Sequence, residues 1–416
     1  MKTQKTHIKH ISLIKNFFLF VTMLFLFNNC VEEIEFNDSD FNKLLVVKAS
    51  LNDEFKKHRV ELSRINALNS DEDTFETKAI VTIIENSQKT YSFTELPNGI
   101  YESKLPFKAT LGNQYSLHIK TLDGEMYKSI PEEIQGINNI DKINAKPDTD
   151  TFGAEGLTIS VESKSTNNDA KYYKYTYSET YKIIAPYFST KGLKIISDVY
   201  PWKVEEYIHN EKREVCYNTI ESINLIQTET NSLSENVAVL PILFIKKEDF
   251  KIAHRYSLEV KQHVQSYEAY TYFKTLNKLS NEENVFSQSQ QGFLQGNIIP
   301  TKNQGNKVVG FFEVNSTSKK RIFFNLNEIF PDHFINTREL CKVFAPALTT
   351  FSFIDRVPIP DTDFSPLIDA LKNGYLYTDK ASFGGIDMPG PYTIVKKECG
   401  DCRVNGTNIK PNFWID

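Results

Sequence analysis

Short runs of apolar and β-branched residues follow residue 43, and several of them alternate with polar residues. Such runs occur at 44–51, 79–84 and 115–119. Alternation with a period of two and β-branched runs are typical of strands. Turn signals lie between them at Pro97-Asn98-Gly99 and Asp123-Gly124. Short strands at a spacing of roughly 8–12 residues predict an immunoglobulin-like or transthyretin-like β-sandwich over residues 43–130.

The segment 131–150 differs from this pattern. It is polar and contains Pro131 and Pro147. Segments of this composition are typical of connections between domains. We therefore expect a linker here.

The remaining residues, 151–416, have the pattern of a larger β-rich domain. Strand-like runs occur at 157–161, 170–181, 255–260, 308–314 and 321–324. Apolar residues spaced three and four apart predict a helix over 266–279. Ser365 and Pro366 predict the start of another over 365–373, because serine caps a helix and proline fits its first turn. The predicted fold class is therefore mainly β, with a few helices in the second domain.

Tyrosines recur at every second position in the run that begins near residue 170, at Tyr173, Tyr175 and Tyr177. One interpretation is a platform for carbohydrate or peptide. The plainer interpretation is one packed face of a sheet, since aromatic side chains bury large areas.

Residues 1–29 have the order of a secretory signal. Four lysines and no acidic residue precede the apolar run Phe17–Phe27, and Cys30 follows closely. A run of this length is too short to span a bilayer, which takes about 20 residues, but it is typical of a signal peptide. A cysteine directly after such a run resembles the cleavage site of bacterial lipoproteins. We therefore expect lipidation at Cys30; the alternatives are an uncleaved anchor and an ordinary signal with a chance cysteine.

An acidic tether is expected at residues 30–42. Glu32, Glu33 and Glu35 follow the cysteine, and such a stretch resembles the surface-export signal of Bacteroidota lipoproteins. The alternative is a solvated tether with no signal function. Removing residues 1–29 takes away four lysines and no acid, which leaves 44 basic and 53 acidic residues and changes the net charge from −5 to −9. An acidic body argues against adsorption to anionic lipid through a basic face.

Composition narrows the class of protein. Apolar residues make up 40% of the chain and charged residues 24%, which excludes bulk disorder. The single long apolar run excludes a membrane protein with several spans. No basic block of nucleic-acid-binding density occurs, so no nucleic-acid partner is expected.

Four cysteines remain if Cys30 carries lipid: Cys216, Cys341, Cys399 and Cys402. An even number in an oxidising compartment predicts disulfides, with three connectivities open. Cys399 and Cys402 could pair with each other, or each could pair with one of the distant cysteines. A redox or metal function is the weaker alternative, because loop residues follow the motif and no second such motif is present.

No catalytic motif stands out in the sequence. We find no nucleophile elbow, zinc-protease motif, phosphate-binding loop or dinucleotide fingerprint. The sequence therefore predicts no catalytic residue, no metal site and no cofactor. Among 53 acidic residues, a pair of carboxylates suited to glycoside hydrolysis stays open.

Several segments resemble one family. They are 45–47 (LVV), 272–276 (YFKTL), 295–298 (QGNI), 309–314 (VGFFEV), 320–321 (KR), 399–403 (CGDCR), 405–408 (NGTN) and 410–414 (KPNFW). Together with the signal they resemble the Bacteroidota lipoproteins of domain of unknown function four-two-four-nine. This chain departs from the family at Phe273, where tryptophan is commoner, and at Asn405-Gly406, where a glycine pair is usual. The resemblance implies an outer-membrane lipoprotein, often encoded beside a TonB-dependent receptor, and brings no established activity.

These observations favour a non-catalytic lipoprotein, anchored in the outer membrane through acylated Cys30 and exposed at the cell surface. It is expected to act as an accessory or ligand-capture partner of a TonB-dependent transporter in nutrient uptake. The alternatives are an envelope hydrolase acting on glycan or peptide, and an adhesion or assembly protein.

Overall fold

The computed structural model describes residues 44–64, 74–164, 170–230, 237–281, 294–303, 305, 307–381 and 390–416. The predicted signal, the tether and Cys30 lie outside these residues. Within them the chain is mainly β, which confirms the predicted fold class. The described helices include none that is both long and apolar enough to cross a membrane.

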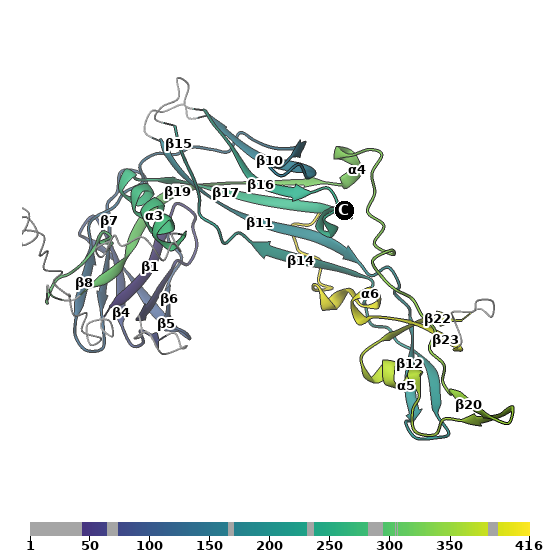
Figure 1. Ribbon diagram of the computed structural model, residues 1–416. Helices are drawn as coiled ribbons and strands as arrows, with labels where there is room; N and C mark the ends of the chain where they lie inside the picture. The colour runs from purple at the N-terminus through teal and green to yellow at the C-terminus, as the bar shows by residue number, and fades with distance from the viewer. Residues whose placement is uncertain are drawn as a thin grey trace, which may run out of the picture.

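An N-terminal β-unit lies at one end of the molecule (Figure 1). Its first eight strands are β1 (Leu45–Asn52), β2 (Arg59–Arg64), β3 (Thr74–Phe75), β4 (Ile80–Glu85), β5 (Lys89–Leu96), β6 (Ile100–Ser103), β7 (Tyr115–Lys120) and β8 (Met126–Ser129). They follow one hydrogen-bonded path, β1-β2-β6-β5-β4-β7-β8, with β3 beside β2. Alternate residues of these strands fill a core that contains the fully buried Leu45, Tyr101 and Tyr115.

Two strands from much later in the chain complete this unit. β18 (Ile298–Pro300) pairs with β8, and the first half of β19 (Val308–Phe324) pairs in parallel with β1. The core of the unit therefore includes Phe312 and Val314. Local patterns could not predict this, because a parallel pair needs a crossover, and here the intervening chain supplies it.

The central β-unit begins where β19 leaves β1. From Ser316 onward, β19 pairs antiparallel with β17 (Tyr256–Gln265). The same sheet holds β11 (Tyr172–Ile184), β14 (Val215–Glu221) and β15 (Ile226–Glu229), and a separate sheet holds β9 (Lys142–Thr149), β10 (Glu155–Lys164) and β16 (Val237–Lys246). Both sheets contribute to one core, in which Tyr173 and Tyr175 are fully buried. The tyrosine run is therefore a packed face, as the plainer interpretation predicts.

The prediction of a linker over residues 131–150 is wrong for residues 142–149, which form strand β9. Lys142–Thr149 pairs with β10 along its length. Among the described strands, β9 pairs with β10 alone. It is therefore an edge strand, where a proline such as Pro147 costs no ladder hydrogen bond. Most of its residues face solvent and Ile143 is buried, which explains why the segment has the composition of a linker.

Helix α3 (Tyr267–Asn281) lies beside the N-terminal β-unit, where the sequence predicts a helix over 266–279. Helix α5 (Pro366–Lys372) lies in the second predicted helical segment. The hydroxyl of Ser365 accepts a hydrogen bond from the amide of Ile368 at 3.3 Å, which is the cap expected from the sequence.

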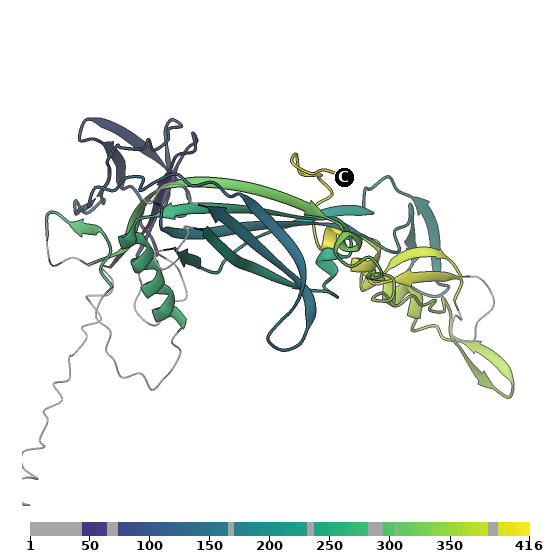
Figure 2. The same cartoon turned by 90° about the horizontal axis from the view of Figure 1, so that it is seen from above.

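A distal unit extends away from the central β-unit at the end opposite the N-terminal β-unit (Figures 1 and 2). Its strands form the pairs β12 (Lys191–Ser197) with β13 (Lys203–Ile208), β20 (Phe351–Ile354) with β21 (Val357–Pro360), and β22 (Leu376–Lys380) with β23 (Tyr392–Val395). The remaining short helices are η1 (Phe250–Ile252), α4 (Leu326–Ile329), α6 (Lys397–Gly400) and η2 (Cys402–Val404).

Two disulfides hold the end of the chain in place. Cys216 on β14 pairs with Cys402, and Cys341 pairs with Cys399 on α6. Of the three connectivities left open by the sequence, this is one in which both cysteines of the CGDC motif reach back to distant partners. The tail then returns to the central β-unit, where Trp414 is 5% exposed and packs edge-on against Tyr217 and Phe323.

Candidate binding cleft between the N-terminal and central units

A cleft of about 590 Å³ lies where α3 faces strands β1, β2 and β19. We call it the junction cleft. Strand β1 forms the floor of this cleft. Successive side chains of a strand point to opposite faces, so Leu45, Val47 and Leu51 point into the core, whereas Lys48 and Ser50 point into the cleft.

One wall of the junction cleft is aromatic and aliphatic. Tyr272, Phe273 and Leu276 of α3 line it, together with Phe311 of β19. The rings of Tyr272 and Phe311 lie 5.4 Å apart between centroids. This spacing is within the range in which aromatic pairs attract each other, so the wall is a packed and fixed surface.

The opposite wall is cationic. Lys56, Lys57 and Arg59 line it, and Lys48 contributes from the floor. Each has an acidic neighbour: Lys56 lies 2.6 Å from Glu54, Lys57 and Arg59 share Glu102, and Lys48 lies 3.8 Å from Glu61. Because these cations are at least 46% exposed, their ion pairs contribute little free energy and exchange readily with a ligand.

A buried ion pair lies at the inner end of the junction cleft. The ammonium of Lys174, on β11, contacts the carboxylate of Glu313, whose side chain is 2% exposed. The amide of Gln265 donates a second hydrogen bond to Glu313 at 2.9 Å. Burial opposes the charged form of Glu313, but the ammonium of Lys174 more than offsets it, so the pKa of Glu313 lies below its ordinary value.

Lys174 also contacts the aromatic wall of the junction cleft. Its ammonium lies 4.8 Å from the centre of the Phe273 ring, a distance at which a cation is attracted to an aromatic face. The inner end of the cleft therefore combines a buried ion pair with an apolar surface.

Two glycines allow the backbones behind the cleft to approach closely. A Cβ atom on Gly310 would lie 2.2 Å from the carbonyl oxygen of Val47, and one on Gly296 would lie 1.7 Å from that of Gly310. Asn297 exchanges two hydrogen bonds with the backbone of Phe312 at 2.8 and 2.9 Å. Three of the segments that carry the family resemblance, 272–276, 295–298 and 309–314, thus meet here, and packing accounts for part of their pattern.

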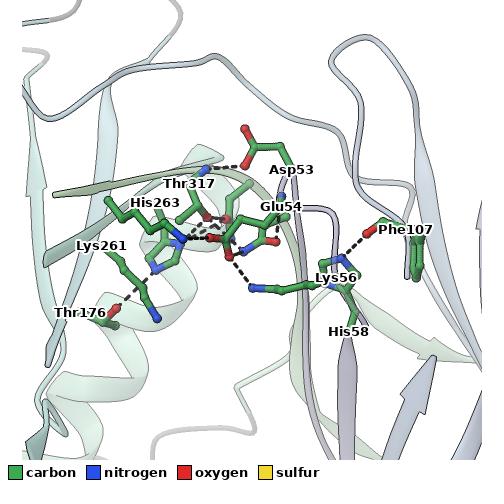
Figure 3. Close-up of polar contacts among 12 residues, drawn as sticks. Asp53, Glu54, Lys56, His58, Phe107, Thr176, Lys261, His263 and Thr317 are labelled. Atoms are coloured by element: carbon green, nitrogen blue, oxygen red, sulfur yellow. Dashed lines mark hydrogen bonds and ion pairs between the residues drawn. The ribbon is translucent and has the colours of Figure 1, made fainter. Parts of the chain in front are cut away.

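A polar network connects the junction cleft to the central β-unit (Figure 3). The amide of Thr317 donates to Asp53 at 2.8 Å, and Asn52 donates to the hydroxyl of Thr317 at 3.2 Å. The ring of His263 contacts the same hydroxyl at 3.0 Å. These bonds tie the loop after β1 to β17 and β19, so they fix the angle between the two units.

His263 should make the protein sensitive to acid. Burial, aided by the charge of Lys174, lowers the pKa of His263 from 6.5 to about 4. Between these values the unfolded chain binds a proton that the folded chain does not, so acidification favours unfolding, by about 3 kcal/mol at pH 4. We expect urea denaturation of His263→Gln to lose this part of the pH dependence; an unchanged slope between pH 7 and pH 4 would contradict the assignment.

Glu132 is a functional candidate that the sequence did not single out. Burial raises its pKa to about 7, and the nearby Glu268 and Glu313 add to the shift. Its carboxylate accepts hydrogen bonds from Asn297 at 3.0 Å and from Ser266 at 3.4 Å. It does not line the junction cleft. The polar sequence around residue 132 does not indicate a buried carboxylate. The burial depends on segments that are brought together only in the folded structure.

The cysteines named from the sequence lie elsewhere. Cys216, Cys341, Cys399 and Cys402 are consumed in the two disulfides and do not line the junction cleft, and Cys30 is outside the described residues. Local sequence patterns do not predict the junction cleft, because its walls come from segments that are more than 200 residues apart in the chain.

A family model described as a domain of unknown function, DUF4249, matches residues 31–321. The chain belongs to the DUF4249 family. The match covers more than half of the chain and includes β1, β2, α3 and most of β19, which build the junction cleft. It ends within β19 and includes β12 and β13 of the distal unit, whereas β20 to β23 and the C-terminal segments 399–414 lie outside it. No curated protein matches this DUF4249 chain.

Proposed function

We propose that this protein is a lipid-anchored, surface-exposed component of the outer membrane. The basic segment, the apolar run and Cys30 support this location, and the family match begins at residue 31, directly after that cysteine. Stable anchoring takes more than one acyl chain, which a diacylated cysteine provides. The alternatives are a chain that stays in the membrane through an uncleaved N-terminal anchor and a chain that is secreted without lipid after an ordinary signal is removed.

In this location the protein serves as a non-catalytic capture partner of a TonB-dependent transporter. The observation that carries the capture role is the junction cleft, in which cationic side chains face an aromatic wall. Lysine and arginine bind carboxylates and phosphates, and aromatic rings pack against apolar groups. The ligand class that fits is a small anion with an apolar body. A group of cations is notable in a chain with a net charge of −5.

The hydrolase alternative has weaker support. Glycoside hydrolysis needs two carboxylates that face each other across the substrate. Glu61 and Glu313 line the junction cleft, but Glu313 is held by Lys174 and Gln265. The adhesion or assembly alternative rests on no specific contact in the described residues.

Anchoring should depend on Cys30. Cys30→Ser removes the only thiol in the expected acylation position, so the variant should stay as an unprocessed precursor or become soluble. Palmitate labelling and detergent phase separation measure this, with Ser39→Ala in the same tether as the matched control that keeps the acylation site and both disulfides. Normal labelling of Cys30→Ser would refute the lipid anchor.

Ligand capture should depend on the cationic wall. We expect the protein purified from outer membranes to carry an anionic small molecule, detected by native mass spectrometry. Lys56→Glu/Lys57→Glu should lose this molecule, while Lys191→Glu/Lys194→Glu on the distant strand β12 should keep it. Equal occupancy in both double variants would contradict the assignment of the cleft. Turnover of a glycan or peptide library by the purified protein would favour the hydrolase.

A further inference from the structure

The hairpin β20–β21 exposes a cluster of apolar side chains in the distal unit. It projects from the end of the molecule that lies opposite the N-terminal β-unit (Figures 1 and 2). Its exposed apolar side chains are Phe351 (54%), Phe353 (70%), Ile354 (60%), Val357 (60%) and Ile359 (40%). Because residues of a strand alternate between faces, apolar side chains are exposed on both faces of the hairpin.

The hairpin has a well-defined turn. Asp355 and Arg356 both have positive φ, 51° and 68°, which is the backbone of a type I′ turn. Among the described residues, β20 and β21 pair with no other strand. A two-stranded hairpin alone is only marginally stable in water, and an exposed apolar cluster is typical of a contact surface.

The two outer edges of the hairpin differ in their hydrogen-bonding capacity. The register pairs Phe353 with Pro358 and Phe351 with Pro360. Since proline has no N–H, these are the non-hydrogen-bonded pairs of the ladder, and their backbone groups point outward. The β21 edge therefore lacks donors at both prolines. The β20 edge presents N–H and C=O groups of Phe351 and Phe353.

We propose that β20 is a docking strand, which pairs through this open edge with an extended segment of the partner transporter. The identity of the partner rests on the proposed function. A second strand satisfies the outward backbone groups, and its neighbouring side chains cover the phenylalanines, which is the geometry of strand addition. The two prolines restrict pairing to one side and so prevent sheet growth from the other.

Charge favours a polypeptide over a lipid surface. Residues 349–364 contain three aspartates, one arginine and no lysine. Anionic lipid attracts segments rich in lysine and arginine, so this composition opposes membrane binding. Acyl chains also offer no partner for the outward N–H and C=O groups.

The test uses the lipidated chain and the TonB-dependent transporter that co-purifies with it from outer membranes. Phe353→Pro removes an outward N–H without breaking a hydrogen bond inside the hairpin, whereas Phe353→Leu keeps the N–H and an apolar side chain. We expect Phe353→Pro to weaken capture of the purified transporter by about tenfold or more, and Phe353→Leu to retain capture within about twofold. Equal capture by both variants, or equal loss, would overturn strand pairing.

A second measurement covers the case in which Phe353→Pro alters the hairpin itself. Hydrogen exchange of the wild-type chain should show new protection at the amides of Phe351 and Phe353 when the transporter is bound. Unchanged exchange at both would overturn the proposal while leaving the transporter partnership intact. A wild-type chain that captures no transporter would overturn both.

Vesicles provide the remaining arm of the test. The soluble form of the Cys30→Ser chain, which carries neither the signal segment nor lipid, should not float with vesicles of anionic phospholipid. Flotation that Phe353→Glu abolishes would assign the hairpin to a membrane and overturn the proposal.

Discussion

Replacing Lys174 with methionine is expected to destabilise the protein by about 3–5 kcal/mol at neutral pH. Methionine preserves most of the volume and the contact with Phe273, but it removes the cation that contacts Glu313. The side chain of Glu313 is 2% exposed, so its charge would be left buried with only the Gln265 hydrogen bond. Urea denaturation of the wild type and the variant measures the difference in unfolding free energy.

The effect of Lys174→Met should depend on pH. In the wild type the pKa of Glu313 lies below its ordinary value of 4.5. Its contribution to stability is therefore present above that value and is lost as pH falls through the folded pKa. In the variant, protonation neutralises the uncompensated carboxylate, so the deficit should shrink on acidification.

The matched control is the double variant Lys174→Met/Glu313→Gln. It removes both charges and keeps a hydrogen-bonding side chain, so it should recover most of the lost stability, as replacement of whole buried ion pairs does. A single variant as stable as the wild type, or a double variant as unstable as the single one, would contradict a functional ion pair at this position.

Removal of the Cys216–Cys402 disulfide should have an effect of similar size. The cysteines are 186 residues apart in sequence, and loop-closure entropy for such a separation gives up to roughly 5 kcal/mol. The bond also joins β14 to the C-terminal tail. We expect Cys216→Ala/Cys402→Ala to lower the urea midpoint more than Cys341→Ala/Cys399→Ala, whose cysteines are 58 residues apart.

Mass mapping of non-reduced peptides tests the connectivity independently of stability. Peptides that join Cys216 to Cys402 and Cys341 to Cys399 are expected. A disulfide between Cys399 and Cys402, or four free thiols in protein purified from the envelope, would contradict the pairing.

Features that a single segment determines could be predicted from the sequence. Alternation and turn residues predict the strands of the N-terminal β-unit, and Ser365 with Pro366 predicts the start of α5. The tyrosine run predicts a packed sheet face. Each of these depends on contacts within a few residues or on a burial pattern that one element displays alone.

Features that depend on distant segments could not be predicted. The parallel pairing of β1 with β19 brings residue 45 beside residue 308, and no local pattern encodes this register. The same pairing creates the junction cleft and buries Glu313 beside Lys174. Strand β9 was missed for a related reason, because an exposed edge strand with a proline has the composition of a linker.

The most direct test of the central claim is co-purification of the wild-type chain, extracted in mild detergent from outer membranes, followed by mass spectrometry of bound proteins and small molecules. We predict a lipidated protein in complex with a TonB-dependent transporter and carrying an anionic ligand. A chain that purifies without lipid, without a transporter and with an empty cleft would contradict a role in capture at the membrane surface.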